Sequence, residues 1–534
     1  MKKTESLFVG AGLLFAVIAV CVGIAKSQQV ANVGNLPTTK YGAFLAAQHA
    51  IYINDFDAAV EFGAVLDGQD GAAVKNIKVM SDFLSGHLPD GAADLTKESG
   101  TAARLIYDAY LVEQGAWEKL YSRHKNDNSA FIAPLRIWSS VGINHRTEAI
   151  KFVESLPTNE SWKSFVRGQI YAETGNVEKA TAEFSKVRAD FMNINDYLYI
   201  MSFYKHNSLS EAADVLRDEF TSRPGGLFMS DYENVPDWSN FSGTKNALAF
   251  SVIQNVSHTQ VMMYSDLAIL LLRFAQIIMP DGSDENAINY YIGQYFFNND
   301  GDYKPYFSKI DSTSPFYLFA TLRDTEQSGD MKKLRRVLRA HPLFVPAMNK
   351  LVAYYISNGD KSSALRILRR AMNNESLSDA SHAFLLKSRA QVYFVFDDLD
   401  KAQSDIHAAA DVLTLDPEIL ALQAKIWAAQ GREIDTAYEY AMTLVKRNPS
   451  DVFAWDVLGR VVAVREGDDA ALELIERVGE VANDCSSLFE NLGDLYARGG
   501  DYERARYAYM RAIDLSDDGL VVVPKIQKKI RKIK

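Results

Sequence analysis

A spacing of 34 residues, repeated in the C-terminal part of the chain, constrains the fold more than any other feature of the sequence. The segments that start at Val452 and Ser486 place a Leu-Gly pair at the same offset, at 458–459 and 492–493. In both segments apolar and small residues recur at intervals of three or four, which indicates amphipathic helices rather than strands. The sequence therefore predicts a stack of similar helical units that bury their apolar faces against each other.

Three further segments, which start at Ser161, Val345 and Ala383, carry the same offsets. Each unit combines small residues, which allow two helices to approach closely, with large residues that fill the space between helix pairs. The small residues are Gly168, Ala390, Gly459 and Gly493, and the large ones are Tyr171, Phe184, Tyr393 and Tyr496. Weaker units begin near Thr39, Ala130, Asn193, Asn286 and Pro315. We therefore expect helical units along most of the chain.

This pattern resembles the tetratricopeptide repeat, in which W-x2-L-G-x2-Y is followed by A-x3-F and then by P within 34 residues. The resemblance implies an all-α fold, in which helix-turn-helix units stack into a right-handed superhelix with an extended concave surface. A looser similarity, carried by YGAFLAAQHA at 41–50, links the chain to exported tetratricopeptide proteins of alphaproteobacteria. That second similarity implies no known activity.

The N-terminus predicts export from the cytoplasm. Lys2 and Lys3 precede residues 7–25, a run of 19 residues without charge. This length lies between the apolar region of a cleaved signal peptide and the roughly 20 residues of a spanning helix, so residues 1–25 are either a signal peptide or an uncleaved anchor. The lysine pair would stay in the cytoplasm. Both alternatives place the body in the periplasm of a Gram-negative cell, either free or anchored to the inner membrane.

Composition divides the rest of the chain into a linker, two repeat regions and an interruption between them. Residues 26–38 form a polar linker. The expected N-terminal solenoid covers 39–222 and the C-terminal solenoid covers 247–519. Between them, 223–246 contains two prolines, three glycines and no helical period. Its aromatic residues favour packing on the solenoid, and a loop that contacts a ligand is the alternative.

The tail, residues 520–534, concentrates positive charge. It contains six Lys and Arg residues, whereas the whole chain has a net charge of -11. Ile526, Ile530 and Ile533 share one helical face that can dock on the last repeat. The sequence therefore predicts a basic cap helix. Contact with anionic lipid or with the acidic body of the chain is the alternative.

The sequence lacks several common motifs of catalysis, metal binding and phosphate binding. It lacks a Gly-rich phosphate loop, G-x-S-x-G, H-E-x-x-H and C-x-x-C. Its nine histidines have no metal-ligand spacing. The acidic net charge argues against nucleic acid as a partner. We therefore expect no catalytic residue, no metal site and no cofactor.

The resemblance also implies where a ligand would bind, because tetratricopeptide repeats use the inward-facing positions of the first helix of each unit. In the C-terminal units these positions are Phe384, Lys387, Gln391, Lys425, Phe453, Asp456, Arg460, Glu490, Asp494 and Arg498. This set mixes both charge signs with aromatic rings, which favours an extended or helical peptide that carries both charges. A solvated inner face without a ligand is the alternative. Lys425 and Arg460 are both expected at the solvent.

The sequence therefore predicts a non-catalytic scaffold that binds a protein or peptide partner in the cell envelope. The N-terminal segment would also contact the membrane if it is not cleaved. Two alternatives remain open. One is a structural or assembly component of an envelope or glycan-export machine, and the other is an enzyme with a catalytic loop at 223–245.

Overall fold

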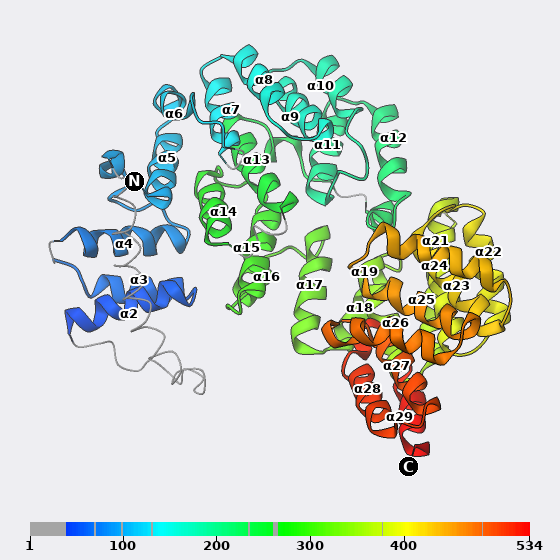
Figure 1. Ribbon diagram of the computed structural model, residues 1–534. Coiled ribbons are helices and arrows are strands. Elements are labelled where there is room, and N and C mark those ends of the chain that lie inside the picture. The colour runs from blue at the N-terminus through cyan, green and yellow to red at the C-terminus, as the bar shows by residue number, and fades with distance from the viewer. Residues whose placement is uncertain are drawn as a thin grey trace, which may run out of the picture. The chain divides into compact units, whose positions relative to one another are not determined.

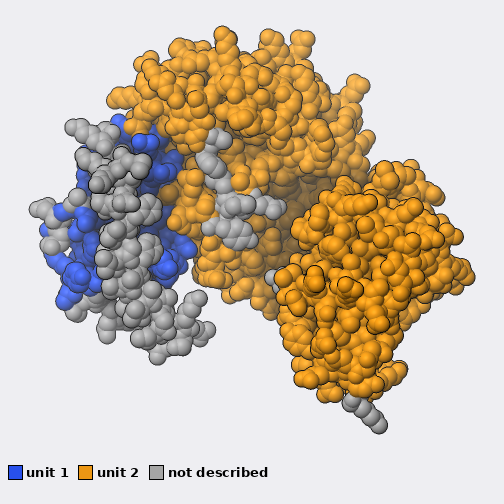
Figure 2. Space-filling view, in the orientation of Figure 1, with its two compact units in different colours: residues 1–110 blue, residues 111–534 orange. Residues whose placement is uncertain are grey.

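The computed structural model describes residues 39–68, 71–97, 100–129, 132–232, 235–259, 265–375, 377–482 and 484–533 (Figure 1). These residues form helices joined by turns, and no strand occurs among them. The chain divides into two compact units, residues 1–110 and 111–534 (Figure 2). The expected all-α fold is confirmed. The predicted signal or anchor segment and its linker lie outside the described residues.

The first unit is a small helical group with its own apolar core. Its helices are α2 (Lys40–Tyr52), α3 (Phe56–Ala64), α4 (Ala72–Leu84), the 3-10 helix η1 (Ala92–Lys97) and most of α5 (Thr101–Glu113). The hydroxyl of Thr39 accepts a hydrogen bond from the Gly42 amide and so caps the start of α2. Ala47, Ala59 and Phe83 are fully buried between the helices.

The second unit begins with helix pairs that follow the predicted repeat. Its first helices are α6 (Trp117–His124), α7 (Ala133–Gly142), α8 (Arg146–Ser155), α9 (Glu160–Glu173), α10 (Val177–Phe184), α11 (Ile194–His206) and α12 (Ser210–Thr221). The ring of Phe184 lies between pairs, with its centroid 5.9 Å from that of Phe165 and 5.4 Å from that of Phe203. The large residue predicted to fill the space between pairs does so.

The aromatic segment at 223–246 packs on the helices around it. It contains two short 3-10 helices, η2 (Leu227–Asp231) and η3 (Trp238–Asn240). Phe228 is buried against Phe344, and Trp238 packs edge-on against Phe203. The interpretation of these aromatics as packing residues is confirmed. The segment lies inside the second compact unit, because the two units divide at residue 110 rather than here.

Helix α13 (Thr244–His258) covers the inner surface of the preceding pairs. It packs against α7 and α9, and Nε1 of Trp138 donates a hydrogen bond of 2.7 Å to Oγ of Ser251. Near its end, Nε2 of Gln254 donates a 2.8 Å hydrogen bond to Asp196 of α11. Residues on every side of α13 are buried. The chain therefore fills this inner surface with one of its own helices.

The C-terminal half continues as consecutive helix pairs. A first group consists of α14 (Asp266–Ile278), α15 (Asn286–Asn298), α16 (Lys304–Phe307), α17 (Pro315–Ser328) and α18 (Met331–Ala340). The following pairs are α19 (Val345–Ser357), α20 (Lys361–Met372), α21 (Asp379–Val395), α22 (Leu399–Ala410), α23 (Pro417–Gln430), α24 (Ile434–Arg447), α25 (Val452–Arg465), α26 (Asp468–Val481), α27 (Ser486–Arg498) and α28 (Tyr502–Asp514).

Close helix contact explains the small residue at the repeat position of α27. A Cβ atom added to Gly493 would lie 2.5 Å from the ring of Tyr509 on α28, well inside van der Waals contact. Only glycine therefore allows these two helices to approach as they do. This confirms the role predicted for the small residues of the pattern.

The chain ends in the 3-10 helix η5 (Ser516–Asp518) and the helix α29 (Val523–Lys532). Ile526 is fully buried, and Ile530 and Ile533 pack on the apolar cluster of the last repeats. Nζ of Lys529 lies 2.7 Å from a carboxylate oxygen of Asp494. The predicted cap helix is confirmed, and so is contact between its cations and the acidic body. Among the described residues, no helix combines the length and apolar character needed to cross a membrane.

Candidate functional site

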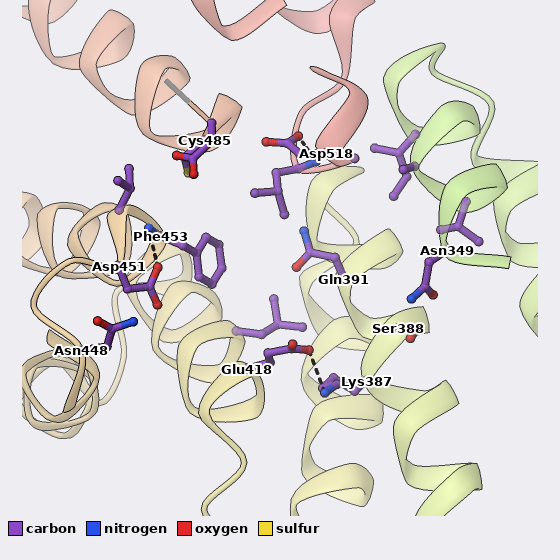
Figure 3. Close-up of a pocket in the computed structure, with 18 of the residues that line it drawn as sticks. Asn349, Lys387, Ser388, Gln391, Glu418, Asn448, Asp451, Phe453, Cys485 and Asp518 are labelled. Atoms are coloured by element: carbon purple, nitrogen blue, oxygen red, sulfur yellow. Dashed lines mark hydrogen bonds and ion pairs between the residues drawn. The ribbon is translucent and has the colours of Figure 1, made fainter. Parts of the chain in front are cut away.

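The first helices of the C-terminal pairs surround a cavity of about 530 Å³ (Figure 3). Its walls come from α19, α21, α23, α25, the turn before α27 and the segment after η5. Its volume falls within the ~300–1,000 Å³ that is common for ligand sites. The residues at its wall are Asn349, Val352, Ala353, Ile356, Lys387, Ser388, Gln391, Glu418, Leu422, Asn448, Ser450, Asp451, Val452, Phe453, Asp484, Cys485, Asp518, Gly519 and Leu520.

One wall of the cavity forms because the chain returns to an earlier helix after its last repeat. Gly519 has a φ of +73°, and a Cβ atom added to it would lie 2.6 Å from Cα and Cβ of Ala353 on α19. Further along, Nζ of Lys525 donates a hydrogen bond of 2.7 Å to the carbonyl of Val395 at the end of α21. The segment after the last repeat therefore contacts α19 and the end of α21, and this contact closes one side of the cavity.

The cavity combines an apolar surface with an excess of carboxylates. Apolar side chains at its wall are Val352, Ile356, Leu422, Val452, Phe453 and Leu520. The carboxylates are Glu418, Asp451, Asp484 and Asp518, and Lys387 is the one Lys or Arg among the wall residues. Asp451 also accepts a 3.0 Å hydrogen bond from the Phe453 amide, so it caps α25 while it faces the cavity (Figure 3).

The charge of Lys387 is already compensated within the wall. Its Nζ lies 2.8 Å from Oε2 of Glu418 and 3.3 Å from Oδ2 of Asp416. The same ammonium lies 5.2 Å from the centroid of the Phe384 ring, within the range of a cation–π contact. Negative charge therefore predominates at the surface that a ligand would meet.

A buried ionic network lies on the first helices next to the cavity. Nζ of Lys425 is 3.3 Å from Oδ2 of Asp456 and 3.0 Å from Oγ of Ser487. The other oxygen of Asp456 accepts a 2.9 Å hydrogen bond from Nε of Arg460. Lys425 is 1% exposed and Asp456 is 0% exposed. The network joins α23, α25 and α27 at their inner faces.

The protonation of this network follows from burial and from the paired charges. Burial lowers the pKa of Lys425, although the charge of Asp456 opposes the change. Burial alone would raise the pKa of Asp456, but the charges of Arg460 and Lys425 hold it below its usual value. Asp456 is therefore the fixed anion that compensates both cations.

The last helix pair carries a sequence match to a known repeat. Residues 486–518, which contain α27, α28 and η5, match the sequence profile of the tetratricopeptide repeat. The chain therefore contains a tetratricopeptide repeat at these residues. No curated protein sequence matches it.

Two solved structures are similar to parts of this chain. One is a tetratricopeptide repeat protein from Parabacteroides merdae, with 13% identity over 54% of this chain and 98% of that one, at a TM-score of 0.32. The other is the Cut9–Hcn1 hetero-tetramer of APC/C, with 12% identity over 90% of this chain and 96% of that one, at a TM-score of 0.31.

Three of the residues predicted from the tetratricopeptide pattern lie at the cavity wall, namely Lys387, Gln391 and Phe453. Phe384 contacts Lys387 beside it. Nε2 of Gln391 is buried and has no hydrogen-bond partner in the described part of the chain. The positions of α21 and α25 that were predicted to face inward therefore bring these side chains to a common site.

The remaining predicted residues make contacts within the fold and do not line the cavity. The expectation that Lys425 lies at the solvent is wrong, because it is buried with Asp456. Arg460 is also mostly shielded, with 22% of its side chain exposed, since it bonds to Asp456 and to the Ser487 carbonyl. Charges at these positions pair across neighbouring first helices, which a single repeat does not reveal.

The last three predicted residues pair with other helices of the chain. Glu490 and Asp494 hold Lys529 of the cap helix, at 2.9 Å and 2.7 Å. Arg498 pairs with Asp468 at the start of α26, 2.6 Å away. None of the three is among the cavity residues. The inner surface of the last repeat is therefore covered by α29.

The structure also adds wall residues that the repeat pattern did not indicate. Asp451 and Asp484 precede the first helices of their units, and Asp518 is the last residue of the final repeat, so none of them occupies a first-helix position. Cys485, also at the wall, is 4% exposed, and burial raises its pKa to about 12. The described residues contain no group of three or more His, Cys, Asp or Glu arranged to hold a metal ion.

Proposed function

We propose that the chain is a non-catalytic tetratricopeptide scaffold that binds a short segment of a partner protein in the cavity at residues 349–520. The observation that carries the proposal is the shared wall, to which the first helices of consecutive units contribute. A wall of this kind presents side chains at regular intervals along a groove, which suits a peptide better than a compact metabolite.

The two inner surfaces of the second unit differ in what covers them. The surface formed by α7, α9 and α11 is occupied by α13, which hydrogen-bonds to Trp138 and Asp196. The surface formed by α19, α21, α23 and α25 leaves a cavity of about 530 Å³. The C-terminal superhelix is therefore the better candidate for a partner.

The chemistry of the wall defines the segment that fits. Its carboxylates exceed its cations, and Lys387 is paired with Glu418 and Asp416. Phe453 and Leu422 provide an apolar surface beside these carboxylates. A partner segment with a Lys or Arg next to an apolar residue satisfies both features. The sequence predicted a partner segment that carries both charges, whereas the wall of the cavity favours a segment with positive charge.

The proposed location is the cell envelope, with the body in the periplasm. The support is the uncharged run at 7–25 after Lys2 and Lys3. A reporter that is active only in the periplasm, fused after Lys534, is expected to be active. A fusion that is active only with a cytoplasmic reporter contradicts the location and leaves the peptide site untouched.

The peptide site is tested by filling the cavity. Gln391→Trp places a large ring at the wall, at a side chain whose Nε2 has no partner to lose. Gln527→Trp on α29 is the matched control, because Gln527 is exposed and outside the cavity. Both full-length variants are used as bait with solubilised envelopes, and the retained proteins are compared with those on the wild type.

We expect Gln391→Trp to reduce capture of the principal partner at least tenfold, and Gln527→Trp to leave it within twofold. Melting temperatures of both variants close to that of the wild type show that the loss comes from the cavity. Undiminished capture by a folded Gln391→Trp chain contradicts the proposal.

A further inference from the structure

Helices α18 and α20 carry a concentration of positive charge in an acidic protein. Between residues 331 and 372 the chain has ten Lys and Arg residues and one carboxylate, that of Asp360, whereas the net charge of the whole is -11. This region lies far from the basic tail in sequence. Charge of one sign gathered on adjacent helices is costly unless an anion compensates it.

Four of these arginines line one pocket. The pocket has a volume of about 350 Å³ and lies between α18 and α20, against a different side of α19 from the inner cavity. Arg335 and Arg339 come from α18, and Arg366 and Arg370 come from α20. The wall also includes Leu338, Ile367 and Tyr355, so an apolar surface lies beside the guanidinium groups.

The guanidinium groups of this pocket are not paired with carboxylates in the described structure. Nη2 of Arg366 donates to Oγ of Ser363, and Nη2 of Arg370 donates to the carbonyl of Arg339. Nε of Arg335 donates to the carbonyl of Met331 in its own helix. Each arginine has five N–H donors, so most of them remain available.

The one carboxylate of the region is engaged elsewhere. Asp360 caps α20 by accepting a 2.9 Å hydrogen bond from the Ser363 amide. Its charge interacts with Arg366 at a distance too long for an ion pair, and its hydrogen bonds to Ser363 hold its pKa below the usual value. Lys333 and Lys361 pair with Asp324 and Asp398 outside this region. Asp360 therefore balances Arg366 in part, and the arginines of the pocket form no ion pair with a carboxylate of the described residues.

We propose that this pocket binds a phosphoryl group carried by an apolar body. Guanidinium groups match the oxygens of a phosphoryl group with two parallel hydrogen bonds, and the wall contains arginines rather than lysines. Leu338 and Ile367 would contact the body that carries the phosphoryl group. The small volume and the acidic remainder of the protein disfavour a nucleic-acid strand, which needs an extended positive surface.

The test compares two double variants of the full chain that remove the same charge from the same helices. Arg339→Gln with Arg366→Gln removes two guanidinium groups at the pocket wall. Arg336→Gln with Arg369→Gln removes two exposed ones that are not at the wall. Binding of phenyl phosphate, inorganic phosphate and vesicles with phosphatidylglycerol is measured by calorimetry at fixed ionic strength.

We expect the wild type to bind phenyl phosphate at least fivefold more tightly than inorganic phosphate, because only the former reaches the apolar wall. The pocket variant should lose at least tenfold in affinity for phenyl phosphate, and the control variant less than twofold. Equal losses of affinity in the pocket variant and the control variant contradict binding in the pocket, because they show that the ligand is attracted by the overall charge of the two helices. Equal affinity for phenyl phosphate and inorganic phosphate shows that the apolar wall does not contribute, and contradicts the proposed apolar body. Vesicle binding without phenyl phosphate binding overturns the proposal in favour of a membrane surface.

Discussion

Lys425 on α23 and Asp456 on α25 form an ion pair with 3.3 Å between Nζ and Oδ2, and both side chains are shielded from solvent. Ser487 on α27 donates a hydrogen bond to the same carboxylate oxygen, 2.5 Å away. Three consecutive units therefore share one charged group at their inner faces. The pair joins successive repeats, in addition to the apolar contacts that every repeat makes.

Replacement of Lys425 by Met is expected to destabilise the protein by about 3 kcal/mol, because it leaves the buried Asp456 with one cation fewer. The control is Lys401→Met, which removes an exposed cation that pairs with Asp398. That change is expected to have little effect, since exposed ion pairs contribute little to stability. Urea unfolding of both variants measures the difference. Equal stability of the two would show that the buried pair does not join the repeats.

Closure of the superhelix predicts a specific cost for Gly519→Ala. Gly519 and Gly500 both have positive φ, +73° and +83°, but a Cβ atom at Gly500 meets no other atom within 4 Å. Gly500→Ala should therefore cost only the backbone strain of roughly 1–2 kcal/mol. Gly519→Ala also forces a Cβ atom into Ala353 and should cost roughly 1–3 kcal/mol more.

Hydrogen exchange distinguishes this closure from general destabilisation. The amides of α29 should exchange faster in Gly519→Ala than in Gly500→Ala, because the contacts of the cap with α19 and α21 are loosened. The same exchange rates in α29 for both variants would contradict a role for Gly519 in closing the cavity.

The contact of His258 with Asp196 predicts a dependence of stability on pH. Burial would lower the pKa of His258, but the charge and hydrogen bond of Asp196, 2.6 Å away, raise it overall. Because the folded pKa is raised, the stabilisation is complete below the unfolded value of about 6.5 and is lost as pH rises through the folded pKa.

Thermal unfolding of the wild type and of His258→Gln between pH 5 and pH 9 measures this contribution. The advantage of the wild type should be largest at the acidic end and should shrink as pH rises above about 6.5. The exposed His382 supplies the control, and His382→Gln should follow the wild type. An advantage that grows with pH would contradict the assignment.

The acidic wall predicts that partner capture weakens when a carboxylate is neutralised. Asp484→Asn removes an exposed carboxylate at the cavity, and Asp469→Asn removes an exposed carboxylate on α26 outside it. We expect capture by Asp484→Asn to fall several-fold at low salt and the difference to narrow at high salt, because exposed charges are screened. Equal capture by both variants at low salt would show that the wall charge does not select the partner.

The helix pairs of this chain could be predicted from its sequence because their causes are local. The Leu-Gly pair at 492–493 marks the close approach to Tyr509, and the isoleucine spacing of the tail marks the face that α29 buries. Such features depend on neighbours within one or two units, so a repeating pattern records them.

The closure and the ionic network could not be predicted in this way. Gly519 and Ala353 meet although they are far apart in sequence, and neither belongs to a shared pattern. Lys425 occupies a position that a single repeat presents to solvent, and its burial depends on side chains from α25 and α27. The packing of α13 on α7 and α9 could not be predicted either, because helical periodicity does not indicate which helices pack against each other.

The most direct test of the proposed scaffold is photo-crosslinking from inside the cavity. A benzophenone amino acid replaces Ser388 at the cavity wall in one full-length variant and the exposed Ser404 on α22 in another. After irradiation in cells, mass spectrometry locates the crosslinked residues. We predict that the Ser388 variant crosslinks to one short segment of a partner protein that contains Lys or Arg beside an apolar residue, and that the Ser404 variant does not. Absence of adducts at Ser388, or the same adducts from both positions, would contradict a peptide site in this cavity.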